Sequence, residues 1–353
     1  MCILVTGCAG FIGFHFVQRL LAEKADNLIL GIDDLNDYYD VRLKEYRLSM
    51  IAQMVETLNN KRWKFICGDI SDKLFIEDVF EKYHPAVVVN LAAQAGVRYS
   101  ITNPDEYIRS NIIGFYNIIQ CCRNEEESGG NFRHLVFASS SSVYGNVHDV
   151  PFKTSAKSDE PVSLYAATKK TDELIAYTYS RLYGIPSTGL RFFTVYGPAG
   201  RPDMAYFLFA DAFRKGEKVK IFNHGKCERD FTYVDDIITG LVSVMSSSPV
   251  MKWSQENKVP FKVYNLGNGH PQNLLQFVNI LRDALVEVGV IEKSFDIAEH
   301  IEMMDAQPGD VDVTYADMTE FENDFGYRPY TDIRTGLIKF ASWYAEFCGT
   351  YKL

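Results

Sequence analysis

The sequence lacks the features that mark several large classes of protein. It contains no long basic run and its formal net charge is −10, so nucleic-acid binding is not expected. No apolar run reaches the length of a transmembrane helix, and membrane insertion is therefore not expected either. What is present is a chain of 353 residues, with 47% hydrophobic and 23% charged residues, which is ordinary for a globular protein with a large core.

Cysteine is scarce and shows no pairing pattern. The seven cysteines are an odd number, none forms a Cys-x-x-Cys pair, and most have apolar neighbours. Buried reduced thiols are therefore expected, and no metal site is predicted. An apolar run at residues 2–5 almost coincides with the start of the sequence, which leaves no room for a signal peptide. A cytoplasmic location is the resulting expectation.

The beginning of the chain predicts a phosphate-binding turn. The apolar run 2–5 is followed by Gly7, Gly10 and Gly13, and a helical stretch occupies residues 14–24. A glycine-rich turn between a strand and a helix lets the backbone approach a pyrophosphate at the positive helix N-terminus. The order of these features predicts a dinucleotide-binding site.

An acidic residue indicates which dinucleotide binds. The second apolar strand, 28–32, ends at Asp33, twenty residues beyond Gly13. A carboxylate at this place can accept hydrogen bonds from the adenosine ribose and would repel a 2′-phosphate. NAD is therefore preferred to NADP, although Arg42 and Lys44 add positive charge downstream.

Apolar strands and helices continue to alternate along the first half. Strands are expected at 63–66, 86–90 and 132–138, with helices at 74–83 and 105–123. Nearly continuous apolar strands separated by helices predict an α/β fold with a doubly wound parallel sheet, in which ligands gather at the carboxyl ends of the strands.

The second half has shorter elements and predicts a smaller domain. The pattern changes near Gly200, and a strand at 263–266 is expected to return to the sheet. We therefore expect an NAD-binding Rossmann domain at 1–190 and a smaller substrate domain at 191–353, interleaved with the first.

A tyrosine and a lysine stand four residues apart in a predicted helix. Tyr165 and Lys169 precede a run without glycine or proline, so both side chains lie on one helical face. A nearby cation favours the phenolate, which makes Tyr165 a candidate general base and acid for a hydroxyl group. The pair alone is a weak signal, because such spacings are common on helices.

Several further motifs resemble those of the extended short-chain dehydrogenase/reductase family, specifically its nucleotide-sugar epimerases. These motifs are TGCAGFIG (6–13), DI (69–70), LAAQAGVRYS (91–100), ASSSSVYG (138–145), SLYAATKK (163–170), RFFTVYGP (191–198), RDFTYVDD (229–236) and PGDV (308–311). Within the family, DDLNDYYDVRLKE, LRFFTVYGPAGRPDMA and FNHGK resemble the group of UDP-glucuronate 4-epimerases.

The resemblance implies an activity. It is the reversible epimerisation of UDP-glucuronate to UDP-galacturonate at carbon 4, through a 4-keto intermediate with transient NADH, in a homodimer. Thr194 replaces the Asn usual in galactose-type relatives, and Ser142 replaces the acidic residue of decarboxylating relatives. The alternatives are a UDP-hexose or UDP-N-acetylhexosamine 4-epimerase, a UDP-glucuronate decarboxylase, and, in a different class, a non-catalytic NAD-binding protein.

The resemblance also implies which residues form the site. Tyr165 would act as the base, Lys169 would hold its phenolate, and Ser140 would bridge tyrosine and substrate. The residues implied for NAD are Gly7, Gly10, Phe11, Ile12, Gly13, Asp33, Asp69, Ile70, Ala92, Ala93, Asn111, Tyr165 and Lys169. Those implied for the UDP-sugar are Ser141, Ser142, Thr194, Arg201, Arg229 and Asp310, with Arg98 as a further cation whose role is not assigned.

Overall fold

The chain folds into two compact units in this computed structural model, which describes residues 1–248, 259–305 and 313–351. The first unit consists of Met1–His148, Thr154–Phe192 and Ile238–Asn265. The second unit consists of Asp149–Lys153, Phe193–Ile237 and Leu266–Leu353. Both units are therefore assembled from segments that are discontinuous in the sequence.

The first unit is built on a seven-stranded sheet with the order β11-β6-β5-β4-β1-β2-β3. Its strands are β1 (Cys2–Thr6), β2 (Leu28–Asp33), β3 (Trp63–Cys67), β4 (Val87–Asn90), β5 (His134–Ser140), β6 (Ser187–Phe192) and β11 (Phe261–Leu266). Every pairing from β3 across to β6 is parallel. The predicted Rossmann fold is confirmed.

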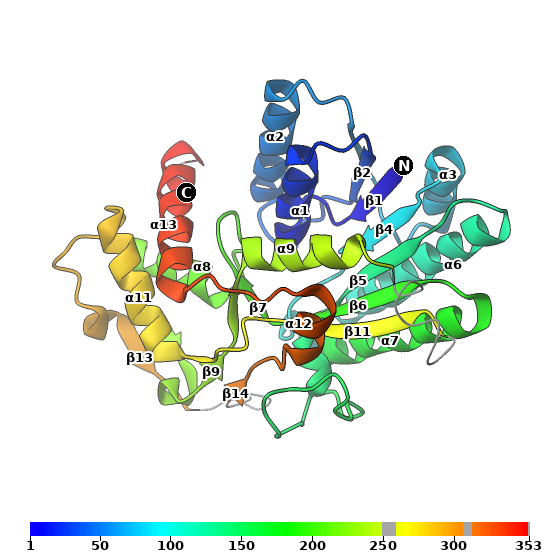
Figure 1. The fold of residues 1–353 in the computed structure, drawn as a ribbon. Coiled ribbons are helices and arrows are strands. Elements are labelled where there is room, and N and C mark those ends of the chain that lie inside the picture. Colours follow the sequence, from blue (N-terminus) through cyan, green and yellow to red (C-terminus); the bar gives the residue numbers. More distant parts are fainter. Residues whose placement is uncertain (249–258, 306–312, 352–353) are drawn as a thin grey trace. The chain divides into compact units, whose positions relative to one another are not determined.

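Helices cover both faces of this sheet, as Figure 1 shows. One face carries α1 (Phe11–Ala22) and α2 (Val41–Thr57), and the other carries α3 (Lys73–Tyr83), α6 (Gly114–Glu127) and α7 (Leu164–Tyr183). Strands β1, β2 and β4 are almost continuously apolar because both of their faces are buried. A core cluster joins Leu4, Val88 and Phe137 of the sheet to Ile76 of α3 and Phe115 of α6.

Helix α7 is bounded by residues that suit its two ends. The Ser163 side chain accepts a hydrogen bond from the Ala166 backbone N–H, which is the usual arrangement of an N-cap. At the other end Gly184 adopts a left-handed conformation with φ of 72°. These two residues favour the observed ends of α7, so Tyr165 lies in its first turn and Lys169 one turn further along.

The stretch expected as one helix at 105–123 is divided. It comprises α5 (Pro104–Tyr107), the π-helical segment η1 (Ile108–Ile113) and α6. Asn111 lies in η1 and is buried. The wider π turn is a common way to turn one side chain inward at a functional site.

The second unit contains short strands and amphipathic helices. A parallel pair joins β7 (Thr194–Tyr196) to β10 (Phe231–Tyr233), and β9 (Glu228–Arg229) lies between β12 (Gln272–Asn273) and β14 (Val313–Thr314). A third pair is β8 (Val219–Ile221) with β13 (Ile301–Met303). The helices are α8 (Ala205–Lys215), α11 (Leu274–Glu287), α12 (Thr319–Phe325) and α13 (Ile333–Tyr351), while α9 (Val234–Met245) passes from the second unit into the first.

Within the described residues, no helix is long and apolar enough to cross a membrane. All seven cysteines lie in the described part of the chain, and all are free thiols. Burial raises the pKa of Cys2 to about 11 and that of Cys121 to about 12, so these thiols stay protonated at neutral pH.

Candidate active site

The glycine-rich turn has a shape that a side chain would destroy. Gly7 has a φ of +68°, and a Cβ atom placed there would come within 2.7 Å of the Ala92 backbone nitrogen. A Cβ on Gly13 would come within 2.1 Å of the Gly7 carbonyl oxygen. The backbone of the glycine-rich turn therefore packs closely against itself just before α1, which begins at Phe11. This geometry fits the pyrophosphate of a dinucleotide.

Asp33 ends β2 directly beside this turn. Its Oδ2 accepts a hydrogen bond of 3.0 Å from the Ala9 N–H, and its Oδ1 accepts one of 3.0 Å from the Leu35 N–H. Burial raises the pKa of Asp33, and the opposing charge of Lys44 lowers it. The carboxylate is therefore fixed in orientation at the place where the ribose of NAD is expected.

Helix α2 supplies two buried cations, Lys44, which the sequence analysis named, and Arg47, which it did not. Lys44 Nζ lies 3.5 Å from Asp33 Oδ1, and both side chains are 6% exposed. Arg47 is fully buried and its Nη1 donates to the Ala9 carbonyl at 2.8 Å and to the Tyr39 hydroxyl at 2.6 Å. Helix α2, which lies between β2 and β3 in the sequence, thus stabilises the backbone of the glycine-rich turn through Arg47. A buried arginine cannot be recognised from residue type alone, because arginines are mostly exposed.

The ends of β3 and β4 carry the other residues implied for NAD. Asp69 pairs with Arg109, and its Oδ1 accepts a hydrogen bond of 2.8 Å from the Ser71 N–H. Ile70 is buried, and the Ala92 N–H donates to the Thr6 hydroxyl at 3.2 Å. These residues, together with the half-buried Ala93, lie at the carboxyl edge of the sheet, which is where ligands of such folds bind.

Asn111 connects this edge to helix α7. Its Oδ1 accepts from the Gln94 N–H at 2.8 Å, and its Nδ2 donates to the Gln94 carbonyl at 3.1 Å. The same amide donates to the Thr168 hydroxyl at 3.0 Å. Asn111 is therefore placed to hold the backbone after β4 against α7, next to Lys169.

Tyr165 and Lys169 lie one turn apart on α7. The Tyr165 ring meets the Tyr107 ring edge-on, with 6.0 Å between the centroids. Lys169 is buried, and its Nζ lies 3.3 Å from Asp172 Oδ2 in an ion pair within the helix. The sequence does not predict the pairing of Lys169 with Asp172, because Asp172 is recognisable there only as a member of the helix.

The four serines span the end of β5 and the turn that follows it. The Ser140 hydroxyl oxygen accepts a hydrogen bond of 3.1 Å from the Ser142 N–H, so it caps the short 3-10 helix η2 (Ser141–Tyr144). Ser141 and Ser142 are half-buried. The capping role of Ser140 leaves its hydroxyl hydrogen available to donate.

A buried charge network holds this turn against α7. The Ser139 hydroxyl donates to Glu173 Oε1 at 2.7 Å, and Arg191 grips both oxygens of Glu173 at 2.8 Å each. Burial would raise the pKa of Glu173, but the hydrogen bonds and charge of Arg191 outweigh it and lower the pKa. The Arg191 guanidinium also lies 4.8 Å from the Tyr144 ring centroid. The network fixes the serine turn relative to Tyr165.

Three of the residues implied for the UDP-sugar lie in the second unit. Thr194 begins β7, and its N–H donates to the Asp230 carbonyl at 3.1 Å. Arg201 is bonded to Asp203 at 3.0 and 2.6 Å, and Arg229 Nη1 donates to the Glu228 carbonyl at 3.0 Å. Arg98, in the first unit, is exposed at the start of α4 (Tyr99–Thr102). Asp310 lies outside the described residues.

Asp230, beside Arg229, was not predicted as important, yet it organises its surroundings. It is fully buried and accepts hydrogen bonds from the backbone N–H groups of Asn268, Gly269 and Ala316 at 2.7, 2.9 and 2.9 Å. Burial raises its pKa, and these bonds oppose that rise. Asp230 therefore fixes the strand that carries Arg229.

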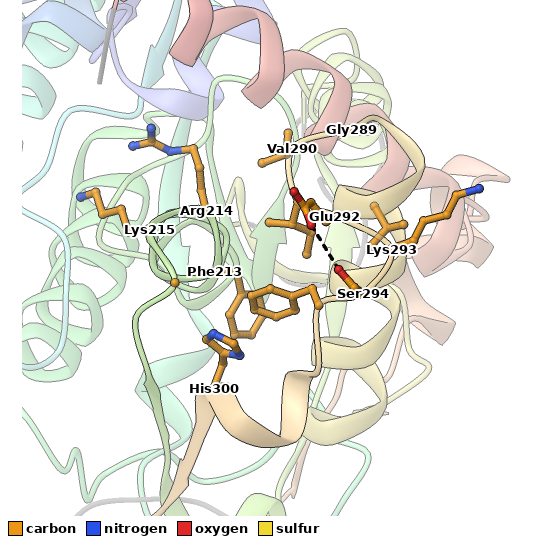
Figure 2. Close-up of a pocket in the computed structure, with 13 residues that line it drawn as sticks. Phe213, Arg214, Lys215, Gly289, Val290, Glu292, Lys293, Ser294 and His300 are labelled. Carbon is orange, nitrogen blue, oxygen red and sulfur yellow. Dashed lines mark hydrogen bonds between the residues drawn. The ribbon is translucent and has the colours of Figure 1, made fainter.

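The second unit also contains a cavity of about 720 Å³, shown in Figure 2. It lies between the end of α8, the chain after α11 and the short helix η4 (Ile297–His300). Its aromatic side consists of Phe213, Phe295 and His300, with Phe295 stacked on His300 at 4.1 Å between ring centroids. The lining residues in the described part of the chain include none of the predicted site residues. Within those same described ranges, no cluster of three or more His, Cys, Asp or Glu side chains could hold a metal ion.

Comparison with known proteins agrees with this architecture. Residues 4–340 match the family model for GDP-mannose 4,6 dehydratase. The chain is 46% identical to "Protein CapI" of Staphylococcus aureus, covering 98% of this chain and 99% of the relative. It is 43% identical to "UDP-glucuronate 4-epimerase 2" of Arabidopsis thaliana, covering 99% of this chain and 76% of the relative.

Among solved structures, the UDP-glucuronic acid 4-epimerase from Bacillus cereus, in complex with UDP-glucuronic acid and NAD, superposes with a TM-score of 0.79. It is 28% identical, and the match covers 98% of this chain and 100% of that chain. The fold and the glycine-rich turn define a dinucleotide-binding α/β enzyme. The chain belongs to the GDP-mannose 4,6 dehydratase family, among the extended short-chain dehydrogenase/reductases, and the resemblance inferred from the motifs is confirmed.

Proposed function

We propose that this chain is an NAD-dependent 4-epimerase that interconverts UDP-glucuronate and UDP-galacturonate. The observation that carries the proposal is an intact Tyr165–Lys169 pair in a chain 43% identical, over almost its whole length, to a protein named UDP-glucuronate 4-epimerase. The Bacillus cereus enzyme that shares the fold was solved with UDP-glucuronic acid and NAD. The glycine-rich turn and Asp33 of this chain have the shape and the charge that NAD requires.

The chemistry assigned to the protein is proton transfer. The bound nicotinamide supplies a reversible hydride acceptor for carbon 4. Tyr165, as phenolate, takes the proton of the 4-hydroxyl group and returns it after the 4-keto sugar has turned its other face. The Lys169 ammonium favours the phenolate, and the Ser140 hydroxyl donates toward the sugar oxygen. The configuration at carbon 4 is inverted, and neither oxidant nor reductant is consumed overall.

A uronate substrate requires control of its carboxylate. The 4-keto form of such a sugar is a β-keto acid, which loses carbon dioxide when the carboxylate bond aligns with the carbonyl π system. We assign the hydroxyls of Ser141 and Ser142 to hold the carboxylate out of that alignment. Thr194 in the second unit has the same donor role by the resemblance to the epimerase group.

The diphosphate and uridine are assigned to residues of the second unit. Arginine suits a diphosphate because its planar fork pairs two oxygens at once. Arg229 is assigned first, because Asp230 fixes the adjacent backbone. Arg201 would exchange its partner Asp203 for phosphate, and Asp310 would accept from the ribose.

The decisive experiment is a product assay. Purified protein with UDP-glucuronate is expected to give UDP-galacturonate, separated by anion-exchange chromatography, with no net change in NADH absorbance. UDP-xylose as the sole product would establish a decarboxylase instead. Turnover of UDP-glucose or UDP-N-acetylglucosamine without turnover of any uronate would establish an epimerase of neutral sugars.

The other functions considered receive less support. Three Arabidopsis thaliana relatives, 43%, 42% and 41% identical to this chain over the aligned regions, are named UDP-glucuronate 4-epimerases. A non-catalytic NAD-binding protein would be expected to have lost Tyr165 or Lys169, and this chain retains both.

We also propose that the enzyme is a cytoplasmic homodimer. Helix α7 exposes Leu174, Tyr177 and Leu182, with exposed fractions of 57%, 46% and 64%, and the neighbouring segment exposes Ile113 and Tyr116. Apolar side chains gathered on adjacent helices suit a second copy of this chain. The free thiols suit a reducing compartment. Light scattering of the purified protein tests the dimer, and fractionation of the source cells tests the location.

A further inference from the structure

The Lys169–Asp172 ion pair of α7 is almost completely buried, and its lysine is the one that the proposed mechanism assigns to Tyr165. The side chains of Lys169 and Asp172 are 4% and 1% exposed, and Nζ and Oδ2 are 3.3 Å apart. Residues three apart on a helix lie on the same face, so Asp172 reaches the lysine from the side away from Tyr165. The cation that the proposed mechanism assigns to Tyr165 is therefore shared with a carboxyl group.

Asp172 is poorly compensated for a buried acid. Its Oδ1 has no hydrogen-bond partner among the described residues, and the adjacent Glu173 adds negative charge. Burial raises the pKa of Asp172 to about 7, against the opposing charge and hydrogen bond of Lys169. Burial therefore favours the protonated form of Asp172 more than it would for an exposed carboxyl group.

The charge of Glu173 is itself taken up by other residues. Arg191 of β6 binds both of its oxygens at 2.8 Å, and Lys170 Nζ lies 3.3 Å from Oε2. The negative charge of Glu173 is therefore balanced by Arg191 and Lys170. Lys169 is therefore the cation that pairs directly with Asp172.

Three neighbouring elements each present an uncharged side chain to this part of α7. Asn111 of η1 binds the Thr168 hydroxyl at 3.0 Å, and Ser139 of β5 binds Glu173 at 2.7 Å. From α5, the phenol of Tyr107 meets the Tyr165 ring. Asp172 is the carboxylate that pairs with Lys169, with 3.3 Å between Nζ and Oδ2.

We propose that Asp172 is a positioning residue that sets how much of the Lys169 charge is available to Tyr165. An ionised Asp172 neutralises the ammonium group, and a protonated Asp172 leaves the whole charge to favour the phenolate. Asp172 and Tyr165 therefore compete for one cation. This inference rests on the proposed function.

The test is the substitution Asp172→Asn, which keeps the shape and removes the charge. The acid limb of the kcat/KM profile for UDP-glucuronate is expected to move to lower pH by roughly 1 unit, because the cation then acts on Tyr165 alone. The difference in Tm between variant and wild type is expected to become more positive from pH 5 to pH 8. Glu77→Gln, which breaks the exposed Lys73–Glu77 pair on α3, should change neither quantity.

Two results would overturn the inference. In one, Asp172→Asn and the second variant Asp172→Ala both keep the wild-type acid limb. In the other, the Tm difference is the same at pH 5 and pH 8, which would show that Asp172 does not titrate between them. If the wild type turns over no UDP-uronate, the proposed function fails separately, and the Tm comparison alone decides whether the Lys169–Asp172 pair titrates as described.

Discussion

Tyr165 is the residue on which the proposed chemistry depends. Replacing it with phenylalanine keeps the ring and its contact with Tyr107 but removes the proton carrier. Turnover of UDP-glucuronate is expected to fall by at least about 10²-fold, in line with the usual contribution of a general base. NAD released by denaturing the variant should equal that of the wild type. Retained activity with full coenzyme content would refute the assignment of the base.

Arg47 gives a second prediction at this scale. Substitution by methionine leaves the Ala9 carbonyl and the Tyr39 hydroxyl without their buried donor, at an expected cost of about 1–3 kcal/mol in the free energy of unfolding. Because Ala9 belongs to the glycine-rich turn, the variant should also retain less NAD after gel filtration.

The matched control for Arg47 lies on the same helix. Arg42→Met removes an arginine that pairs with Asp40 at the exposed start of α2. Exposed pairs contribute little, so this variant should unfold and retain NAD as the wild type does. Equal effects of the two substitutions would show that Arg47 does not brace the turn specifically.

Some residues of the site were predictable from the sequence and others were not, for a physical reason. Gly7, Gly13 and Asp33 were predictable because backbone geometry and ribose recognition demand those residue types at that spacing. The burial of Lys44, Arg47 and Asp172 was not predictable, because charged residues on helices are usually solvated. Their burial depends on which helical face meets the sheet, and the local sequence does not state this.

At the scale of elements, the helix expected at 105–123 shows a related limit. Its apolar period was read correctly as helical, but the π-helical turn at Ile108–Ile113 was not foreseen. The turn is supported by the bonds of Asn111 to Gln94 and Thr168, which are distant in sequence. The spacing of apolar residues over a short stretch of sequence cannot predict hydrogen bonds to residues that are distant in the sequence.

The exposed apolar face of α7 gives an element-scale prediction. Leu174→Asp places a charge on a side chain that is 57% exposed, so the fold of the single chain should be unaffected. If a second copy covers this face, the charge should convert a dimer into a monomer in light scattering. Leu74→Asp on α3, where the side chain is 77% exposed, is the control and should leave the assembly unchanged.

At the scale of the whole molecule, a buried histidine makes stability depend on pH. Burial lowers the pKa of His134 from 6.5 to about 4, while its Nε2 lies 2.8 Å from the Thr188 hydroxyl. The unfolded chain binds a proton below pH 6.5 and the folded chain does not. Folding should therefore lose up to about 3 kcal/mol as pH falls from 6.5 to 4.

The substitution His134→Gln tests that dependence. Glutamine can keep a hydrogen bond to Thr188, and urea unfolding between pH 4 and 7 should show a smaller loss of stability toward low pH than in the wild type. The exposed His148→Gln is the control and should retain the wild-type slope. Identical slopes for all three proteins would show that His134 does not govern acid sensitivity.

The order of strands in the sheet has a consequence for synthesis on the ribosome. Strand β11, which lies at the sheet edge beside β6, is formed by Phe261–Leu266, more than sixty residues after β6 itself. Until that late segment leaves the exit tunnel, the nascent chain presents the edge of β6 unpaired. A translational pause before residue 266 would thus lengthen the time in which two growing chains can join edge to edge.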